Sequence, residues 1–337
     1  PLGAGVFQNF ARNRLNIATQ NATHKGSLSK GKHFFQWGHS LERQTISDQL
    51  NEWELTDSAG YTLPFDPNQL QLSKVIKSKA DLSFFRTSGY VQDNYILNDS
   101  LNMTLQVGVR YNYNTLNNEV LVQPRVQFAM QPLHGKDIVF RAAAGAYHQP
   151  PFYRELRRYD GTVNESVKAQ KSWQVVAGID YNFKGWGNRP FKLQAEAYYK
   201  RMTDIVPYDV DNVRIRYFGS NSAKAYATGI EARLFGELVK DAESWLSIGL
   251  MRTRENLDND QWYNYKLDSL NRPIDSTLVQ GGWIRRPTDR LLSVGLFYQD
   301  YLSTNKNFKF TMSGLYGTNL PYNIPNSVKY RNALTID

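Results

Sequence analysis

The sequence contains no cysteine among its 337 residues, which excludes both a disulfide framework and a thiolate metal site. It also contains no apolar run that approaches the roughly 18 residues a transmembrane helix needs. The first residues, PLGAGVFQNF, lack an initiator methionine and show neither the basic nor the apolar region of an export signal. From this beginning we expect the chain to be a fragment or a processed piece of a longer protein.

Motifs that carry catalysis or bind metals are missing as well. The sequence has no GxSxG, Walker or GxGxxG motif, and its five histidines do not show an HExxH or comparable spacing. Asp258 and Asp260 resemble part of a calcium loop, but the spaced glycine and the terminal glutamate of such a loop are absent. We therefore expect no enzyme, no metal site and no cofactor.

The excess of basic residues does not point to a nucleic-acid partner. Lysine and arginine number 40 against 31 acidic residues, for a net charge of +9. These residues are spread along the chain, and no nucleic-acid fold signature accompanies them. Positive charge at the rim of a membrane protein can face anionic lipid instead.

A two-residue alternation of apolar and polar side chains dominates the sequence. In residues 101–114, LNMTLQVGVRYNYN, the odd positions are apolar or aromatic, and the even ones are polar or glycine. Side chains alternate across a pleated strand, and no segment shows a helical period over three turns, so the pattern predicts an all-β protein. The other alternating segments are 138–146, 173–183, 191–200 and, more weakly, 226–238, 292–298 and 308–316.

The connections between these segments alternate between short turns and long polar loops. Transmembrane barrels have this arrangement, and their strands need about 9–11 residues, whereas soluble strands average about 5–6. We predict an antiparallel up-and-down transmembrane β-barrel, of which this sequence supplies about 12 strands and a thirteenth that begins at Ala333. Long loops are expected near 44–79, 149–169, 205–221, 255–286 and 318–332, and the connection near Asn117 is a short exception.

The composition of the two strand faces agrees with a wet barrel interior. Aromatic residues flank the short turns, for example Phe183, Trp186 and Phe191, as in the aromatic girdle of outer-membrane barrels. A sheet with two unpaired edges cannot span hydrocarbon, because each unpaired backbone group there costs several kcal/mol. Either closing strands lie outside this sequence, which we expect, or the sheet closes on itself with an unexpected number of strands. The expected lumen-facing residues are Gln106, Arg110, Arg141, Gln174, Asp180, Gln194, Glu196 and Lys200.

From about Ala80 onward, the sequence resembles TonB-dependent outer-membrane receptors. The stretches that carry this resemblance are GAYHQPPFYRELR (145–157), KAQKSWQVVAGIDYNF (168–183), AEAYYKRMTDIVPYDV (195–210), RYFGSNSAKAYATGIEARLFGEL (216–238) and GTNLPYNIPNSVKYRN (317–332). The resemblance implies a barrel of about 22 strands filled by an N-terminal plug domain. It also implies uptake of a scarce nutrient (an iron chelate, cobalamin, a glycan or a peptide) driven through the TonB complex.

On this resemblance, residues 1–337 are the C-terminal part of such a barrel, and the plug domain and the final strand or strands lie outside the sequence. The implied location is the outer membrane of a bacterial cell. The implied partners are outer-membrane lipid and lipopolysaccharide, the protein's own plug domain, and the TonB complex through that plug. A surface lipoprotein is a further partner that the resemblance leaves open.

The stretch GAYHQPPFYRELR also supplies the first candidate ligand site. Pro150 and Pro151 cannot donate to a sheet ladder, so the strand should end near His148 at the outer rim. Arginines there can receive an anionic or polar ligand, and aromatic rings can give flat apolar contact. Alternatively, the arginines bind lipopolysaccharide phosphates or pair with Glu155 and Asp160. The candidate residues are Tyr147, Gln149, Phe152, Tyr153, Arg154, Arg157 and Arg158.

A second candidate group, Trp262, Tyr263 and Tyr265, lies in the stretch NLDNDQWYNYK (256–266). These rings can stack on a sugar or chelate ring, or they can simply order their own loop. Two further function classes also remain open. One is a passive porin-like channel, which a plug-encoding region upstream would exclude. The other is a soluble surface ligand-binding β module, which release by high salt without detergent would favour.

Overall fold

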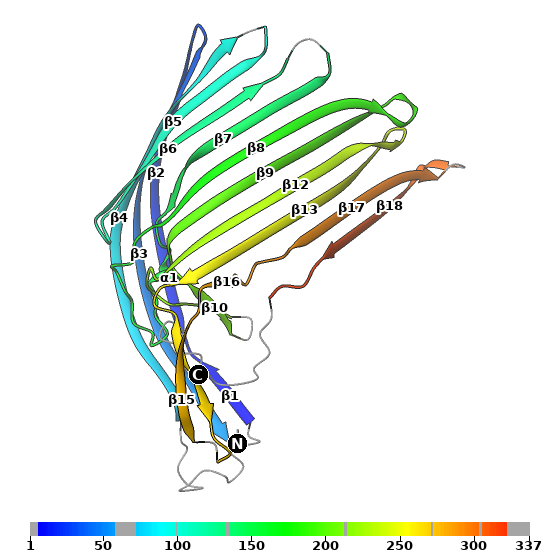
Figure 1. Cartoon of the computed structure of the whole chain (residues 1–337). Coiled ribbons are helices and arrows are strands. Elements are labelled where there is room, and N and C mark those ends of the chain that lie inside the picture. The colour runs from blue at the N-terminus through cyan, green and yellow to red at the C-terminus, as the bar shows by residue number, and fades with distance from the viewer. Residues whose placement is uncertain are drawn as a thin grey trace.

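The computed structural model describes residues 6–57, 72–98, 100–132, 135–211, 214–270, 272–302 and 305–321, and most of them form antiparallel strands (Figure 1). The elements are β1 (Val6–Ala11), β2 (Arg14–Lys30), β3 (His33–Asp57), β4 (Leu72–Asn98), β5 (Met103–Asn114), β6 (Glu119–Met130), β7 (Asp137–Gln149), α1 (Tyr153–Leu156), β8 (Gln170–Gly185), η1 (Trp186–Asn188), β9 (Arg189–Ile205), β10 (Tyr208–Asp211), β11 (Arg214–Tyr217), β12 (Ala223–Val239), β13 (Ala242–Leu257), β14 (Gln261–Leu267), β15 (Pro273–Gln280), β16 (Trp283–Arg285), β17 (Leu292–Leu302) and β18 (Asn305–Gly317). Within these described ranges, no helix has the length and apolar character needed to cross a membrane.

The large sheet is an up-and-down meander, as predicted. Its path runs β1-β3-β4-β5-β6-β7-β8-β9-β12-β13-β17-β18, with β2 also paired to β3 and β16 also paired to β13. In the described part of the chain, β2 and β18 each pair on one side only, so the sheet is an open piece of a barrel wall. The all-β class and the partial barrel wall are confirmed, and the described sheet contains 14 strands against the predicted number of about 12. The strand predicted from Ala333 and most of the loop at 318–332 lie outside the described residues.

The two rims differ as the loop rhythm predicts. At one end, which we call the short-turn rim, β2–β3, β4–β5, β6–β7, β8–β9, β12–β13 and β17–β18 are joined by turns of a few residues. At the other, which we call the long-loop rim, the connections are longer and carry α1, β10–β11 and β14–β15 (Figure 1). The turn at 115–118 is the short member of this rim, as expected.

The predicted loop over 44–79 is wrong for most of its length. β3 continues to Asp57 and β4 begins at Leu72, and their register runs without a shift from His33–Tyr95 to Glu54–Lys74. Polar residues dominate both faces of this extension, for example at the pair Ser47–Asp81. A strand that projects beyond the hydrocarbon needs no apolar face, so the hydropathy of this segment resembles that of a loop.

The two faces of the sheet differ in polarity. On the apolar face, register pairs such as Val107–Val126, Val175–Tyr199 and Ile230–Leu250 place large side chains together, and most of them are exposed. On the polar face, Gln106 pairs with Gln127, and Glu196 pairs with Glu231. The residues expected to face the lumen therefore lie together on one face, opposite the apolar set.

Candidate functional site

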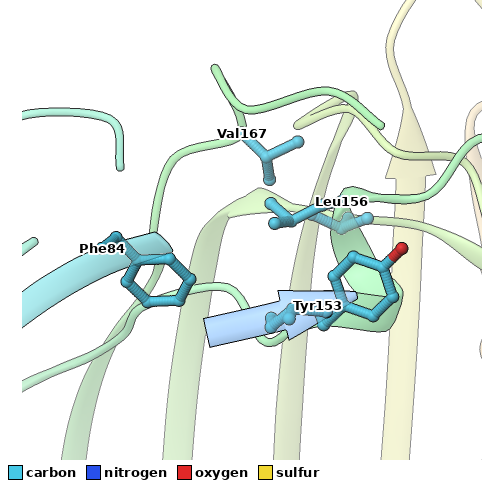
Figure 2. Packing of buried hydrophobic residues seen from close by; sticks show 6 residues of the cluster. Phe84, Tyr153, Leu156 and Val167 are labelled. Atoms are coloured by element: carbon cyan, nitrogen blue, oxygen red, sulfur yellow. The ribbon is translucent and has the colours of Figure 1, made fainter. Parts of the chain in front are cut away.

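The connection between β7 and β8 folds back over the polar face at the long-loop rim. β7 ends at Gln149, one residue before Pro150, and the single turn of α1 follows. The Phe152 N–H donates to Glu155 Oε2 at 3.1 Å, which fixes the start of this turn. The α1 side chains of Tyr153 and Leu156 then pack with residues from β3, β4 and the following loops. That buried cluster is Ile46, Phe84, Tyr153, Leu156, Val167 and Val206 (Figure 2).

The buried Asp48 carboxylate on β3 holds this connection in place. Tyr153 Oη donates to Asp48 Oδ2, and Arg157 Nη2 forms an ion pair with the same oxygen. The Arg157 guanidinium also lies 5.2 Å from the centroid of the Tyr153 ring. Burial, followed by the hydrogen bond to Asp48, raises the pKa of Tyr153 to about 12. Tyr153 therefore remains a neutral donor at any physiological pH.

Glu155 is almost fully buried on the other side of α1. Besides the bond from Phe152, its Oε1 accepts a hydrogen bond from Gln170 Nε2 at 2.6 Å, and Gln170 begins β8. Burial raises the pKa of Glu155 to about 7, against the lowering effect of those two hydrogen bonds. The protonation state of this carboxyl group can therefore change near neutral pH.

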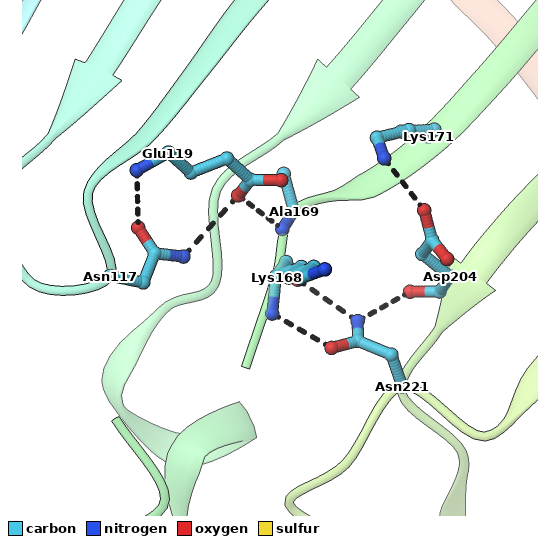
Figure 3. A network of polar contacts seen from close by, with 7 residues as sticks. All are labelled: Asn117, Glu119, Lys168, Ala169, Lys171, Asp204 and Asn221. Carbon is cyan, nitrogen blue, oxygen red and sulfur yellow. Dashed lines mark hydrogen bonds and ion pairs between the residues drawn. The ribbon is translucent and has the colours of Figure 1, made fainter. Parts of the chain in front are cut away.

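A polar network ties three connections of the long-loop rim together (Figure 3). Glu119 Oε2, at the start of β6, accepts the Ala169 N–H at 2.7 Å. Asn221, after β11, accepts the Lys168 N–H at 2.7 Å and donates to the Lys168 and Asp204 carbonyl oxygens at 2.9 and 2.7 Å. These bonds satisfy backbone groups of the β7–β8 connection that no strand pairs, so the connection is a fixed part of the rim.

An arginine-rich cavity of about 470 Å³ opens beside α1. Four arginines line it, whereas Glu52 is the one carboxylate among its lining residues, and that group accepts a hydrogen bond from Asn13 Nδ2 at 2.6 Å. Clustered guanidinium groups give a positive potential and planar donors that match carboxylate or phosphate. We call this the arginine cavity; its lining residues are Ala11, Asn13, Leu50, Glu52, Ile76, Arg154, Arg157, Arg158, Tyr159, Gly161, Ile215, Arg216 and Tyr217.

Only some of the site residues predicted within 145–158 lie at the arginine cavity. Arg154, Arg157 and Arg158 line the arginine cavity, and Phe152 is exposed beside it with its ring 5.4 Å from that of Tyr217. Tyr153, in contrast, is buried, so its ring is not available to a ligand in this conformation.

Tyr147 and Gln149 lie at the end of β7, away from the cavity lining. The Tyr147 ring lies 4.3 Å from the Arg125 guanidinium on the polar face, whereas Gln149 is exposed and pairs in register with Gln170.

The observed ion pair differs from the pairing with Glu155 and Asp160 that the sequence suggested as an alternative to ligand binding. Arg157 pairs with Asp48 rather than with Glu155 or Asp160. Asp160 accepts hydrogen bonds from the hydroxyl and N–H of Thr162, and these bonds lower its pKa.

The second candidate group is separate from the arginine cavity. Trp262, Tyr263 and Tyr265 lie on β14, and none of them lines that cavity. Tyr263 and Tyr265 are exposed, with ring centroids 6.3 Å apart. In the described part of the chain, no group of three or more His, Asp or Glu side chains is placed to hold a metal ion.

Sequence reasoning missed the residues that complete the cavity from other elements. Arg216 and Tyr217 come from β11, and Leu50, Glu52 and Ile76 come from β3 and β4. The stretch that begins RYFGSNS contains the first two, but its pattern says nothing about which loop they face.

Comparisons with known proteins agree with this architecture. The sequence profile described as "TonB dependent receptor-like, beta-barrel" matches residues 3–335. No protein of curated function matches the chain. Among solved structures, the copper transporter OprC is similar with a TM-score of 0.56 and 14% identity over 86% of this chain and 42% of that one. The outer membrane transporter YddB from Escherichia coli is similar with a TM-score of 0.50 and 13% identity over 89% and 47%, respectively. The chain therefore spans less than half the length of either.

Proposed function

Since the chain belongs to the TonB-dependent receptor-like β-barrel family, we propose that it forms part of the wall of an outer-membrane receptor that takes up a small anionic nutrient. The apolar face supports the membrane placement. Trp173 and Phe183, at opposite ends of this face on β8, are ten residues apart. At about 3.3 Å per residue and a tilt of about 45°, they are separated by about 23 Å along the membrane normal, close to the ~25 Å apolar band of such barrels.

The open edges of the sheet indicate that the wall is completed by further strands. Unpaired backbone groups on β2 and β18 would be costly in hydrocarbon, so we propose that other strands of the same receptor pair with them. The polar face then encloses a lumen that a plug domain fills, and the TonB complex acts on that plug. The long-loop rim lies outside the cell, because the short turns of such barrels are periplasmic.

The arginine cavity is the proposed ligand site, and it is the observation that carries the substrate class. It lies at the outer rim on the lumen side, and Arg154 and Arg158 contribute guanidinium groups that take no part in the Arg157–Asp48 ion pair. Tyr159 and Tyr217 add aromatic surface. The set suits a carboxylate- or phosphate-bearing solute with an apolar part.

Equilibrium binding of citrate and of pyrophosphate to the purified receptor tests the site. The Arg154→Gln/Arg158→Gln double variant should weaken binding at least about tenfold, since hydrogen bonds to charged groups contribute ~1.5–3 kcal/mol each. Lys168→Gln is the matched control, because Lys168 is exposed in the same connection but does not line the cavity. Equal affinities in the double variant and the wild type would contradict the assignment.

Uptake of the bound solute by cells with and without a functional TonB complex distinguishes the receptor from a passive channel. Energised uptake should stop without that complex, whereas diffusion through a porin-like channel should continue. Extraction distinguishes the third class, because a soluble surface module would be released by high salt without detergent.

A further inference from the structure

A row of arginines and aromatic residues crosses the apolar face near the long-loop rim. Cross-strand register defines this row, which runs Trp173–Arg201–Tyr226–Arg254–Arg285 over β8, β9, β12, β13 and β16. Cross-strand partners lie on the same face of a sheet, so all five side chains leave the face that carries Val175 and Ile230. The row is therefore on the outside of the wall, opposite the arginine cavity.

The next rows mark where the apolar face begins. Two residues closer to the short-turn rim on each strand, the register pairs Tyr199 with Thr228 and Thr228 with Arg252. Two residues beyond those, Ile230 pairs with Leu250, and the face is apolar from there toward the short-turn rim. Arginine and aromatic side chains thus occur together at the level where hydrocarbon gives way to lipid headgroups, which is where amphipathic rings are favoured.

The positive charge of this surface is not balanced within the part of the chain that the structure describes. No ion pair to Arg201, Arg252 or Arg254 occurs among those residues, and Arg285 alone has a carboxylate nearby, with its Nε 3.7 Å from Asp289 Oδ2. Arg254 and Arg285 are direct cross-strand neighbours, an arrangement in which like charges repel.

The Nε atom of Arg254 is also buried without a hydrogen-bond partner among the described groups. A buried donor without a partner is unfavourable. An external anion would relieve both the repulsion and the missing hydrogen bond.

We propose that Arg201, Arg252 and Arg254 bind the phosphates of a phosphorylated glycolipid, lipopolysaccharide, in the outer leaflet, with Trp173 and Tyr226 packed at the boundary of its acyl chains. Guanidinium groups bind phosphate through paired hydrogen bonds. Strands lie about 4.8 Å apart, so Arg201 and Arg254 are about 10 Å apart across β12, a separation that allows one lipid to engage both. The inference rests on the membrane orientation proposed above, because only the outer leaflet faces this row.

The test measures how much lipopolysaccharide stays bound to the full receptor after mild detergent extraction. Native mass spectrometry detects the bound phosphorylated lipid. The Arg201→Gln/Arg252→Gln/Arg254→Gln variant should retain at least about tenfold less than the wild type. The matched control removes three positive charges from the polar face of β9 and β12, two strands of the same row, through Lys192→Gln, Lys200→Gln and Arg233→Gln, and should retain the wild-type amount. After its lipid has been removed, wild-type receptor should bind lipid again in nanodiscs that contain bisphosphorylated lipid A. Zwitterionic nanodiscs and inorganic phosphate should not substitute for lipid A.

Retention by the triple variant within about twofold of the wild type would overturn the proposal, as would equal loss in the polar-face control or saturation of the site by inorganic phosphate alone. An Arg201→Lys/Arg252→Lys/Arg254→Lys variant, which keeps the charge, guards against misfolding, because it should retain more lipid than the glutamine variant. Release of the wild-type protein by high salt without detergent would instead refute the membrane placement and hence the proposed function.

Discussion

Replacing Asp48 with asparagine should release the β7–β8 connection from the polar face. The carboxylate is buried, it accepts the Tyr153 hydroxyl, and it forms the ion pair with Arg157. Asparagine keeps an acceptor for the hydroxyl but leaves the guanidinium without an opposite charge. The change therefore removes the ion pair while preserving the shape of the site.

The expected magnitude follows from the burial of the two partners. Breaking a buried ion pair by removing one partner costs ~3–5 kcal/mol, and a hydrogen bond to a charged group contributes ~1.5–3 kcal/mol. The Arg157 side chain is 25% exposed, so water recovers part of that loss. We expect a cost of about 2 kcal/mol, which makes opening of the connection about 30-fold more frequent, since 1.4 kcal/mol corresponds to a factor of ten.

Hydrogen exchange followed by mass spectrometry measures this effect in peptides that cover residues 150–165. Asp48→Asn should accelerate exchange there by about 30-fold while leaving the strands protected. Asp180→Asn is the control, because Asp180 pairs with Arg141 on the polar face through a 2.6 Å contact and does not touch the connection. If exchange in Asp48→Asn stays within about twofold of the wild type, the ion pair does not hold the connection in place.

Three further predictions use the same structure. Burial raises the pKa of Glu155 from 4.5 to about 7, so the carboxyl group holds its proton more tightly when the β7–β8 connection is packed against the polar face than when the connection is open. Exchange protection of the connection should therefore be full below about pH 4.5 and decline as the pH rises through about 7, and Glu155→Gln should abolish that decline. Ile230→Lys should destabilise the protein in lipid vesicles by ~2–4 kcal/mol in urea titrations, and Val176→Lys on the polar face by much less, so equal effects would contradict the assignment of the faces. Gly219 has φ +64°, and a Cβ there would lie 2.7 Å from Arg158 Cγ. Gly219→Ala should therefore destabilise this connection by at least ~1–2 kcal/mol and increase hydrogen exchange around Arg158, whereas unchanged exchange would show that the neighbouring loops adjust.

The strands and rims could be predicted from sequence because their signal is local. Alternation within 101–114 and 173–183 places each side chain on a face without knowledge of the rest of the chain, and turn lengths reveal the two rims. The extension of β3 and β4 could not be predicted in this way, because its polar faces lack the alternation on which the prediction rests.

The candidate site could be predicted only in part, because its contacts link distant segments. Asp48 and Arg157 are 109 residues apart, and no pattern in either segment indicates the pair. The burial of Tyr153 depends on Phe84 and Val167 in the same way. The arginines of 154–158 do lie in one cavity, but Arg216 joins them only through the fold. The ligand-binding roles of these residues and of Trp262, Tyr263 and Tyr265 stay predictions.

The long β3–β4 extension would separate the proposed ligand site from the bilayer. On β3, Leu41 is the last large apolar residue that is exposed before Leu50, which lies in the arginine cavity nine residues further along. Nine residues span about 30 Å along the strand at about 3.3 Å per residue, or about 21 Å along the membrane normal at a tilt of about 45°. Guanidinium groups at that height remain in a high-dielectric environment, and substitutions among them leave the lipid-facing surface untouched. If the arginine cavity binds the solute as proposed, mutation could change the preferred solute without affecting membrane insertion, and specificity and assembly could evolve independently.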